Sequence, residues 1–349
     1  MTSSSRLQGY PDPGPGLRLH LNENTGGCSA KVLDAIRRVD PRDVSTYPSY
    51  PELVGACAQH FGVDPDWMLL TNGLDEGILM AALGHIARAR AFDAETIVPL
   101  PAFDPYPNAS VAAGATPVRI PPRPGYVFQV DEVIAAITPR TKMIFLNTPN
   151  NPTGQLIPRD DLRRIADAAP HAVVLIDEAY IEFGGQSFLP ELPRYPNVLI
   201  GRTFSKAYGL AGMRVGIVIG QPQSLDAVRA VTLPFNINGV ALAATLAALE
   251  DKDFLPRYAA QVTASRTRLY DACRALGLTF WESAANFVLV QVGDAVPLVV
   301  QALAARGVHV RDRSKDATTP GCIRITAGML DHTTAAIEAL ESVAAGRPR

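Results

Sequence analysis

The feature that most constrains the fold is an alternation of short apolar runs with longer helical patterns between residues 66 and 220. The runs are WMLLT, ETIVPL, ATPVRI, KMIFLN, HAVVLID, NVLIGR and RVGIVIG. Several are apolar throughout, which is typical of central strands covered by helices on both faces of a largely parallel sheet. The sequence therefore predicts an α/β fold with a sheet of about seven strands.

Beyond Asn238 the pattern changes to long helical stretches followed by short strands such as NFVLVQV and CIRIT. A chain of 349 residues is also long enough for about two domains. We therefore expect an N-terminal arm over residues 1–30, a large domain over residues 31–250, and a smaller α+β domain over residues 251–349.

Composition excludes several classes of partner. The chain has 32 Lys and Arg against 34 Asp and Glu, so it offers no basic surface for nucleic acid or an anionic membrane. No stretch is long and apolar enough to span a membrane, and the N-terminus does not resemble a secretion signal. The four cysteines contain no C-x-x-C pair, which favours free thiols in the cytoplasm and no metal site: Cys28, Cys57, Cys273 and Cys322.

Polar residues follow two apolar runs directly. Residues 147–154 (NTPNNPTG) come after KMIFL, and residues 177–180 (DEAY) come after HAVVLI. Either segment alone is also explained by an ordinary turn or a helix cap. In a parallel sheet, however, both meet at the ligand-binding edge. A buried Asp177 needs a cationic partner there, and a protonated pyridine nitrogen is one.

A third loop at the same edge carries Lys206. A single lysine is usually a solvated surface group, but Thr203, Ser205 and Arg214 accompany this one. Hydroxyls and a guanidinium suit a phosphate, and a lysine amine can form a Schiff base with an aldehyde. Together the loops indicate one ligand that has an aldehyde, a pyridine nitrogen and a phosphate.

The motifs NNPTG, DEAYIEF, RTFSKAYGLAGMRVG and CIRITAG occur in this order. Together they resemble the class I/II aminotransferases of fold type I, and most closely the histidinol-phosphate aminotransferase group, over residues 18–326. The resemblance implies pyridoxal 5′-phosphate (PLP), carried by Lys206 and paired with Asp177 at its ring nitrogen. It also implies that Tyr180 and Asn151 contact the ring oxygen, that Tyr106 stacks on the ring, and that the phosphate is bound by Thr203, Ser205, Arg214 and the backbone amides of Leu74 and Asp75.

The same resemblance suggests how substrate and a second subunit are bound. Arg324 would bind a substrate carboxylate, and Arg311 would join it in holding a substrate phosphate. A strand arginine paired locally and a solvated basic loop remain alternatives for these two. Tyr10 and Asn24 match an arm that closes over the substrate, although Thr25 stands where relatives usually have proline. Tyr47 matches a tyrosine that reaches the neighbouring subunit's phosphate, which implies a homodimer.

The expected reaction transfers an amino group from histidinol phosphate to 2-oxoglutarate, a step of histidine biosynthesis. Its products are imidazole acetol phosphate and glutamate. Transamination of aromatic or other amino acids remains an alternative, as does decarboxylation of threonine phosphate on the same fold. A Rossmann dehydrogenase is not expected, because no G-x-G-x-x-G follows the first strand.

Overall fold

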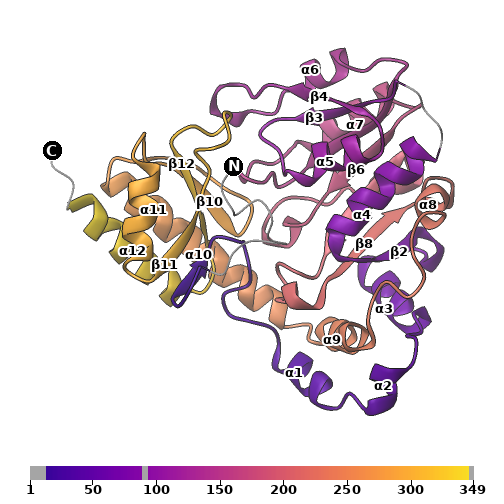
Figure 1. Ribbon diagram of the computed structural model, residues 1–349, viewed down its shortest axis with the longest axis horizontal. Helices are drawn as coiled ribbons and strands as arrows, with labels where there is room; N and C mark the ends of the chain where they lie inside the picture. The colour runs from indigo at the N-terminus through magenta and orange to yellow at the C-terminus, as the bar shows by residue number, and fades with distance from the viewer. Residues whose placement is uncertain (1–12, 89–92, 346–349) are drawn as a thin grey trace.

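The computed structural model describes residues 13–88 and 93–345, which form two sheets with their covering helices (Figure 1). The larger sheet has seven strands, as predicted. In spatial order they are β2 (Met68–Asn72), β8 (Val215–Gly220), β7 (Val198–Thr203), β6 (Val173–Asp177), β5 (Thr141–Asn147), β3 (Glu95–Pro99) and β4 (Thr116–Ile120). Strand β8 runs antiparallel to both of its neighbours, and the other neighbouring pairs are parallel.

The continuous apolar runs are explained by burial along whole strands. Every residue of β6, β7 and β8 is buried. Helix α4 packs against β2, β7 and β8, and α5 packs against β3 and β4. The helices that accompany this sheet are α3 (Pro51–Phe61), α4 (Gly73–Ala82), α5 (Pro105–Ala112), α6 (Val130–Ala135), α7 (Arg159–Ala168) and α8 (Pro222–Arg229). A strand covered on both faces has no position for a solvated side chain.

The smaller sheet has five strands, one of which comes from the arm. Their order is β1 (Leu17–Leu19), β11 (Val308–Asp312), β12 (Cys322–Thr326), β10 (Phe287–Gln291) and β9 (Thr279–Trp281). Strand β1 pairs in parallel with β11, which places the indigo arm beside the yellow C-terminal strands (Figure 1). Helices α10 (Phe254–Ala275), α11 (Val296–Ala304) and α12 (Leu330–Ala345) pack around this sheet.

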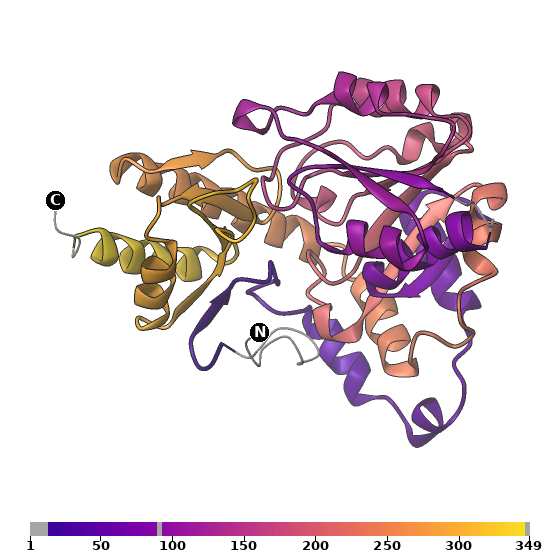
Figure 2. The ribbon, with the colours of Figure 1, turned by 45° about the horizontal axis from the view of Figure 1, so that its top comes forward.

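The remaining helices connect the arm with the larger sheet. They are α1 (Ala30–Arg37), α2 (Pro41–Ser45) and α9 (Gly239–Glu250), and α9 packs against α1, α2 and α3. Helix α10 contacts both β9 and β10 of the smaller sheet and the turn at Ile181–Phe183, so it bridges the two sheets (Figure 2). The division of the chain at residues 30 and 250 stays a prediction.

One close backbone approach ties the larger sheet's ligand-binding edge to the smaller unit. Gly154, in the loop after β5, accepts a hydrogen bond at 2.8 Å from the backbone N–H of Ala284. Gly154 has φ +75°, and a Cβ there would overlap the Ser283 side chain. This position therefore requires glycine both for its conformation and for its space.

We expect Gly154→Ala to destabilise the protein more than Gly62→Ala does. Gly62 ends α3 at φ +68° with open space around it, so its alanine variant measures conformational strain alone, about 1–2 kcal/mol. Gly154→Ala adds overpacking, about 1–3 kcal/mol more. Urea unfolding of both apoproteins measures the difference, and equal losses would contradict the contact between loop and small unit.

Candidate active site

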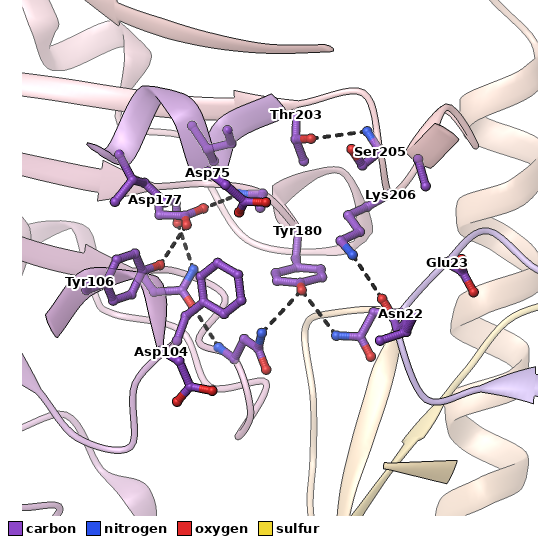
Figure 3. A pocket seen from close by; sticks show the side chains of 18 of the residues that line it. Asn22, Glu23, Asp75, Asp104, Tyr106, Asp177, Tyr180, Thr203, Ser205 and Lys206 are labelled. Carbon is purple, nitrogen blue, oxygen red and sulfur yellow. Dashed lines mark hydrogen bonds between the residues drawn. The ribbon is translucent and has the colours of Figure 1, made fainter. Parts of the chain in front are cut away.

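A cavity of about 400 Å³ lies at the carboxyl ends of β5, β6 and β7, and residues from the arm and the smaller sheet also line it. The structure brings together here most of the side chains that were chosen from the sequence (Figure 3). These are Leu74, Asp75, Tyr106, Asn151, Asp177, Tyr180, Thr203, Ser205, Lys206, Arg214, Arg311 and Arg324. Their individual roles stay predictions.

Asp177 ends β6 inside the protein, with 3% of its surface exposed. One carboxylate oxygen accepts a hydrogen bond from the Tyr106 hydroxyl at 2.6 Å, and the other accepts one from the Ala179 amide at 2.9 Å (Figure 3). Within the described ranges no lysine or arginine forms an ion pair with it. Burial raises the pKa of Asp177 to about 6, against these two hydrogen bonds. Such a carboxylate fits a ligand that brings its own cation.

Lys206 lies in the loop between β7 and β8, which lines the cavity. Its Nζ donates a hydrogen bond to the Leu21 carbonyl at 2.9 Å and lies 6.0 Å from the centre of the Tyr180 ring. Burial, followed by the charge of Arg324, lowers the pKa of Lys206 to about 8. The lowered pKa leaves more of the amine neutral near physiological pH, so Nζ can attack a carbonyl carbon.

The start of helix α4 forms one wall of the cavity. Leu74 and Asp75 lie in the first helical turn and line the cavity, and Asn72 makes no capping hydrogen bond with its side chain. A helix start without a side-chain cap presents backbone N–H groups to a ligand, and the helix dipole favours an anion there.

Arg214 completes this wall together with two hydroxyl groups. Its guanidinium lies so close to Gly73 that a Cβ on that glycine would overlap it, and it pairs with Asp75 at 3.1 Å. The hydroxyl groups of Thr203 and Ser205 line the cavity beside it. Amides, hydroxyls and one guanidinium form a donor set that fits a phosphate group.

Tyr180 is held by two asparagines. Its hydroxyl accepts hydrogen bonds from Asn22 Nδ2 at 3.1 Å and Asn151 Nδ2 at 3.4 Å (Figure 3), and burial raises the pKa of Tyr180 to about 12. Asn22 was missed in the sequence, although it lies in the same LNENT motif as Asn24. Asn22 has a φ of +56°, which is uncommon outside glycine, and this backbone conformation brings its side chain to Tyr180.

The other arm residues lie elsewhere. Asn24 is buried beside the cavity and not in its wall. Its Nδ2 donates to the Ala207 carbonyl at 3.0 Å, which ties the arm to the loop of Lys206. Tyr10 lies outside the described residues. Asn24 thus holds the loop's backbone in this chain, and its contact with substrate stays a prediction.

Tyr47 does not line the cavity of its own chain. Its side chain is 79% exposed, and its ring stacks on that of Phe235 with 4.4 Å between centroids. This location leaves its predicted contact with a neighbouring subunit untested.

The predicted stacking of Tyr106 on a ligand ring stays a prediction, and Tyr106 does line the cavity. The Tyr106 ring packs nearly parallel to Phe145 at 5.2 Å, and its hydroxyl is engaged by Asp177. Phe103 lines the same cavity, is less buried, and meets Tyr106 edge-on at 5.7 Å. The Tyr106 hydroxyl thus orients Asp177, and the rings of Tyr106 and Phe103 both lie in the cavity wall.

Arginines gather at the end of the cavity that the smaller sheet forms. Arg311 on β11 and Arg324 on β12 are register partners, and both line the cavity. Arg324 donates to Asn151 Oδ1 at 2.5 Å and to the His20 carbonyl at 2.9 Å. Arg313, two residues after Arg311, lines the cavity too. This end is suited to an anionic group of a substrate.

Residues 13–88 and 93–345 contain no group of three or more His, Cys, Asp and Glu side chains arranged to hold a metal ion. In the same ranges no helix has the length and apolar character needed to cross a bilayer.

Comparisons with known proteins agree on one family. Residues 15–340 match the family model described as aminotransferase class I and II. Histidinol-phosphate aminotransferase 2 of Ralstonia nicotianae is 38% identical over 94% of this chain and 89% of its own. An aromatic amino acid aminotransferase of Cutibacterium acnes is 36% identical over 95% and 93%. The crystal structure of histidinol-phosphate aminotransferase from Sinorhizobium meliloti with pyridoxal-5′-phosphate has a TM-score of 0.88 at 27% identity, covering 99% of this chain and 97% of that one.

We expect Lys206 of the apoprotein to be acetylated with a midpoint near pH 8, because burial and Arg324 disfavour its charged form. An ordinary lysine has a pKa of about 10.4. The rate of acetylation of the Lys206 peptide by acetic anhydride, followed by mass spectrometry against pH, gives the midpoint. Arg324→Gln removes a nearby positive charge and should raise it, whereas a wild-type midpoint at pH 10 would contradict the structure.

Proposed function

This chain belongs to the class I and class II aminotransferases, and we propose that its substrates are histidinol phosphate and 2-oxoglutarate, giving imidazole acetol phosphate and glutamate. The enzyme uses pyridoxal 5′-phosphate, as the relative from Sinorhizobium meliloti does. The groups in the cavity wall fit this cofactor: a buried carboxylate without an ion-pair partner among the described residues, a buried lysine of lowered pKa, and a helix start suited to an anion.

In this proposal three parts of the cavity wall hold the cofactor. Asp177 keeps a proton on the ring nitrogen, Lys206 Nζ binds the aldehyde carbon, and Arg214 with the start of α4 binds the phosphate. Asn151 and Tyr180 face the ring oxygen, and Tyr106 stacks on the ring. When bound, the cofactor supplies an electron-withdrawing ring that delocalises the electron pair left by removal of a proton from the substrate carbon.

The residues of the chain then move the protons. With cofactor and substrate bound, Lys206 Nζ would be the general base that removes a proton from the substrate carbon. The same amine, once protonated, would be the general acid that gives this proton back. Its lowered pKa suits both directions near neutral pH, and Tyr180 fixes the ring oxygen beside it.

The observation that carries the choice of substrate is the adjacent pair Arg311 and Arg324 in the cavity wall. Two guanidinium groups side by side match a phosphate dianion better than a single carboxylate does. Histidinol phosphate bears such a dianion where amino acids bear their carboxylate, and the named relatives from Ralstonia and Sinorhizobium support this choice.

Aromatic transamination is the second candidate, because the Cutibacterium relative carries that name at similar identity. An aromatic amino acid has one carboxylate, which needs Arg324 alone. Decarboxylation of threonine phosphate is less favoured, since no relative reported above carries that activity.

We expect Arg311→Ala and Arg324→Ala to separate these candidates. In half-reactions of purified holoenzyme, followed by the cofactor's absorption, Arg324→Ala should lower kcat/KM for both histidinol phosphate and glutamate. Arg311→Ala should lower it mainly for histidinol phosphate. Each lost charge-assisted hydrogen bond corresponds to a decrease of roughly tenfold to more than a hundredfold. A wild-type enzyme that ignores histidinol phosphate but converts phenylalanine would transfer the assignment to the aromatic candidate.

We further propose that the enzyme is a homodimer and works in the cytoplasm, where its four cysteines, all free in the structure, stay reduced. Exposed apolar side chains support a dimer: Tyr47 stacks on Phe235, and Val44 and Leu233, three and two residues before them in the sequence, are each 70% exposed. An apolar patch of this kind on a soluble protein commonly marks an interface.

Phe235→Glu should weaken the dimer, because it places a charge in the proposed interface. Sedimentation velocity over a concentration series should show at least about a tenfold rise in the dissociation constant, equal to 1.4 kcal/mol. Leu298→Glu changes a side chain 69% exposed on α11, away from this patch, and serves as the control. A monomeric, fully active wild-type enzyme would rule the proposal out.

A further inference from the structure

Arg313 is a third arginine at the substrate end of the cavity. The pairing of β11 with β12 continues one step past Asp312, because Arg313 N donates to the Cys322 carbonyl at 3.0 Å. In an extended strand alternate residues share a face, so Arg313 follows Arg311 on the face turned to the cavity. Arg311, Arg313 and Arg324 all line it.

The Arg313 side chain is fixed, unlike that of a solvated loop residue. It is 10% exposed, and its Nη2 donates to Asp316 Oδ2 at 2.6 Å. The other Asp316 oxygen accepts from the Thr318 amide at 2.9 Å and from the Thr318 hydroxyl at 2.6 Å. The Thr319 hydroxyl donates to the Arg313 carbonyl at 3.0 Å. The guanidinium is thus oriented before any ligand binds, which lowers the entropic cost of binding one.

The loop that bears Arg313 is also anchored from the larger unit. Tyr126, in the turn Pro124–Tyr126, donates its hydroxyl to the Thr318 carbonyl at 2.9 Å and meets Trp281 edge-on at 4.9 Å. The Nε of Arg313 is buried and has no hydrogen-bond partner among the described residues. A fixed and incompletely satisfied guanidinium in a cavity wall is a site for an anion.

We infer that Arg313, positioned by Asp316, is a specificity-determining residue that favours amines bearing a phosphate dianion. This inference rests on the proposed transaminase function and extends it to a residue outside the pair Arg311 and Arg324. Arg324 binds one face of the anionic group from between Asn151 and His20, and Arg313 adds a donor from the loop side. A carboxylate carries one charge and has fewer oxygens than a phosphate, so it gains less from the Arg313 guanidinium.

The test compares histidinol phosphate with histidinol, which is the same amine without the phosphate, in half-reactions of the holoenzyme. Arg313→Gln should lower kcat/KM for histidinol phosphate about tenfold to a hundredfold and leave histidinol and glutamate within about threefold. Arg313→Lys keeps the charge but not the fork and should lie between. Asp316→Asn, which leaves Arg313 without its carboxylate, should lose part of the same preference.

Lys315→Gln is the matched control, because it removes one positive charge from an exposed position of the same loop and does not line the cavity. It should retain the wild-type preference for the phosphorylated amine. Thermal unfolding of each holoenzyme reports whether the loop is merely loosened. Equal losses for histidinol phosphate and histidinol, or the same loss in Lys315→Gln, would overturn the inference.

Inorganic phosphate separates this inference from the proposed function. If the wild-type enzyme does not convert histidinol phosphate, the proposed substrate is wrong, and phosphate then serves as the probe. Its inhibition constant against the glutamate half-reaction should rise about tenfold or more in Arg313→Gln if Arg313 binds this dianion. An unchanged constant would overturn the inference.

Discussion

The buried carboxylate of Asp177 is the constraint on which the site depends. Three features place it: an apolar strand covered on both faces, a hydrogen bond from Tyr106, and a backbone amide from Ala179. None of them supplies a positive charge. The fold therefore holds a buried carboxylate whose charge a cationic ligand group compensates, and the parallel neighbours β5 and β7 bring their loops to the same edge.

Arg324 links parts of the chain that are far apart in sequence. Its guanidinium is hydrogen bonded to Asn151 in the loop after β5 and to His20 in the arm, while its strand belongs to the smaller sheet. In the same arm, the Asn22 side chain donates a hydrogen bond to the Tyr180 hydroxyl, and the Leu21 carbonyl accepts one from Lys206 Nζ. The arm is therefore part of the site's wall, and pairing of β1 with β11 fixes it to the smaller sheet.

The sequence predicts well whatever depends on strand burial and on the position of a residue at a strand end. The seven-stranded sheet and the grouping of Asp177 with Lys206 follow from these. It predicts less well where loop backbone decides the direction of a side chain. The hydrogen bond from the Tyr106 hydroxyl to Asp177, for example, depends on how α5 sets the ring against Phe145. Arg313 faces the cavity because the β11 ladder continues past Asp312 and Asp316 holds it, and neither contact follows from local pattern.

Burial of the two main ionisable groups of the site makes them reactive and lowers the stability of the folded apoprotein. Burial raises the pKa of Asp177 to about 6. The ionised carboxylate therefore destabilises the folded protein fully above pH 6, and this destabilisation is absent below about pH 4, where the group is protonated in both states. Burial and Arg324 lower the pKa of Lys206 to about 8. The charged amine therefore destabilises the folded protein fully below pH 8, and this destabilisation disappears as the pH rises toward 10.5. At about 1.4 kcal/mol per pKa unit each costs the apoprotein roughly 3 kcal/mol between pH 6 and 8. A ligand that gives Asp177 a cation and binds Lys206 Nζ through a carbonyl carbon removes both costs. The same burial that destabilises the empty cavity thus selects a ligand with these two groups.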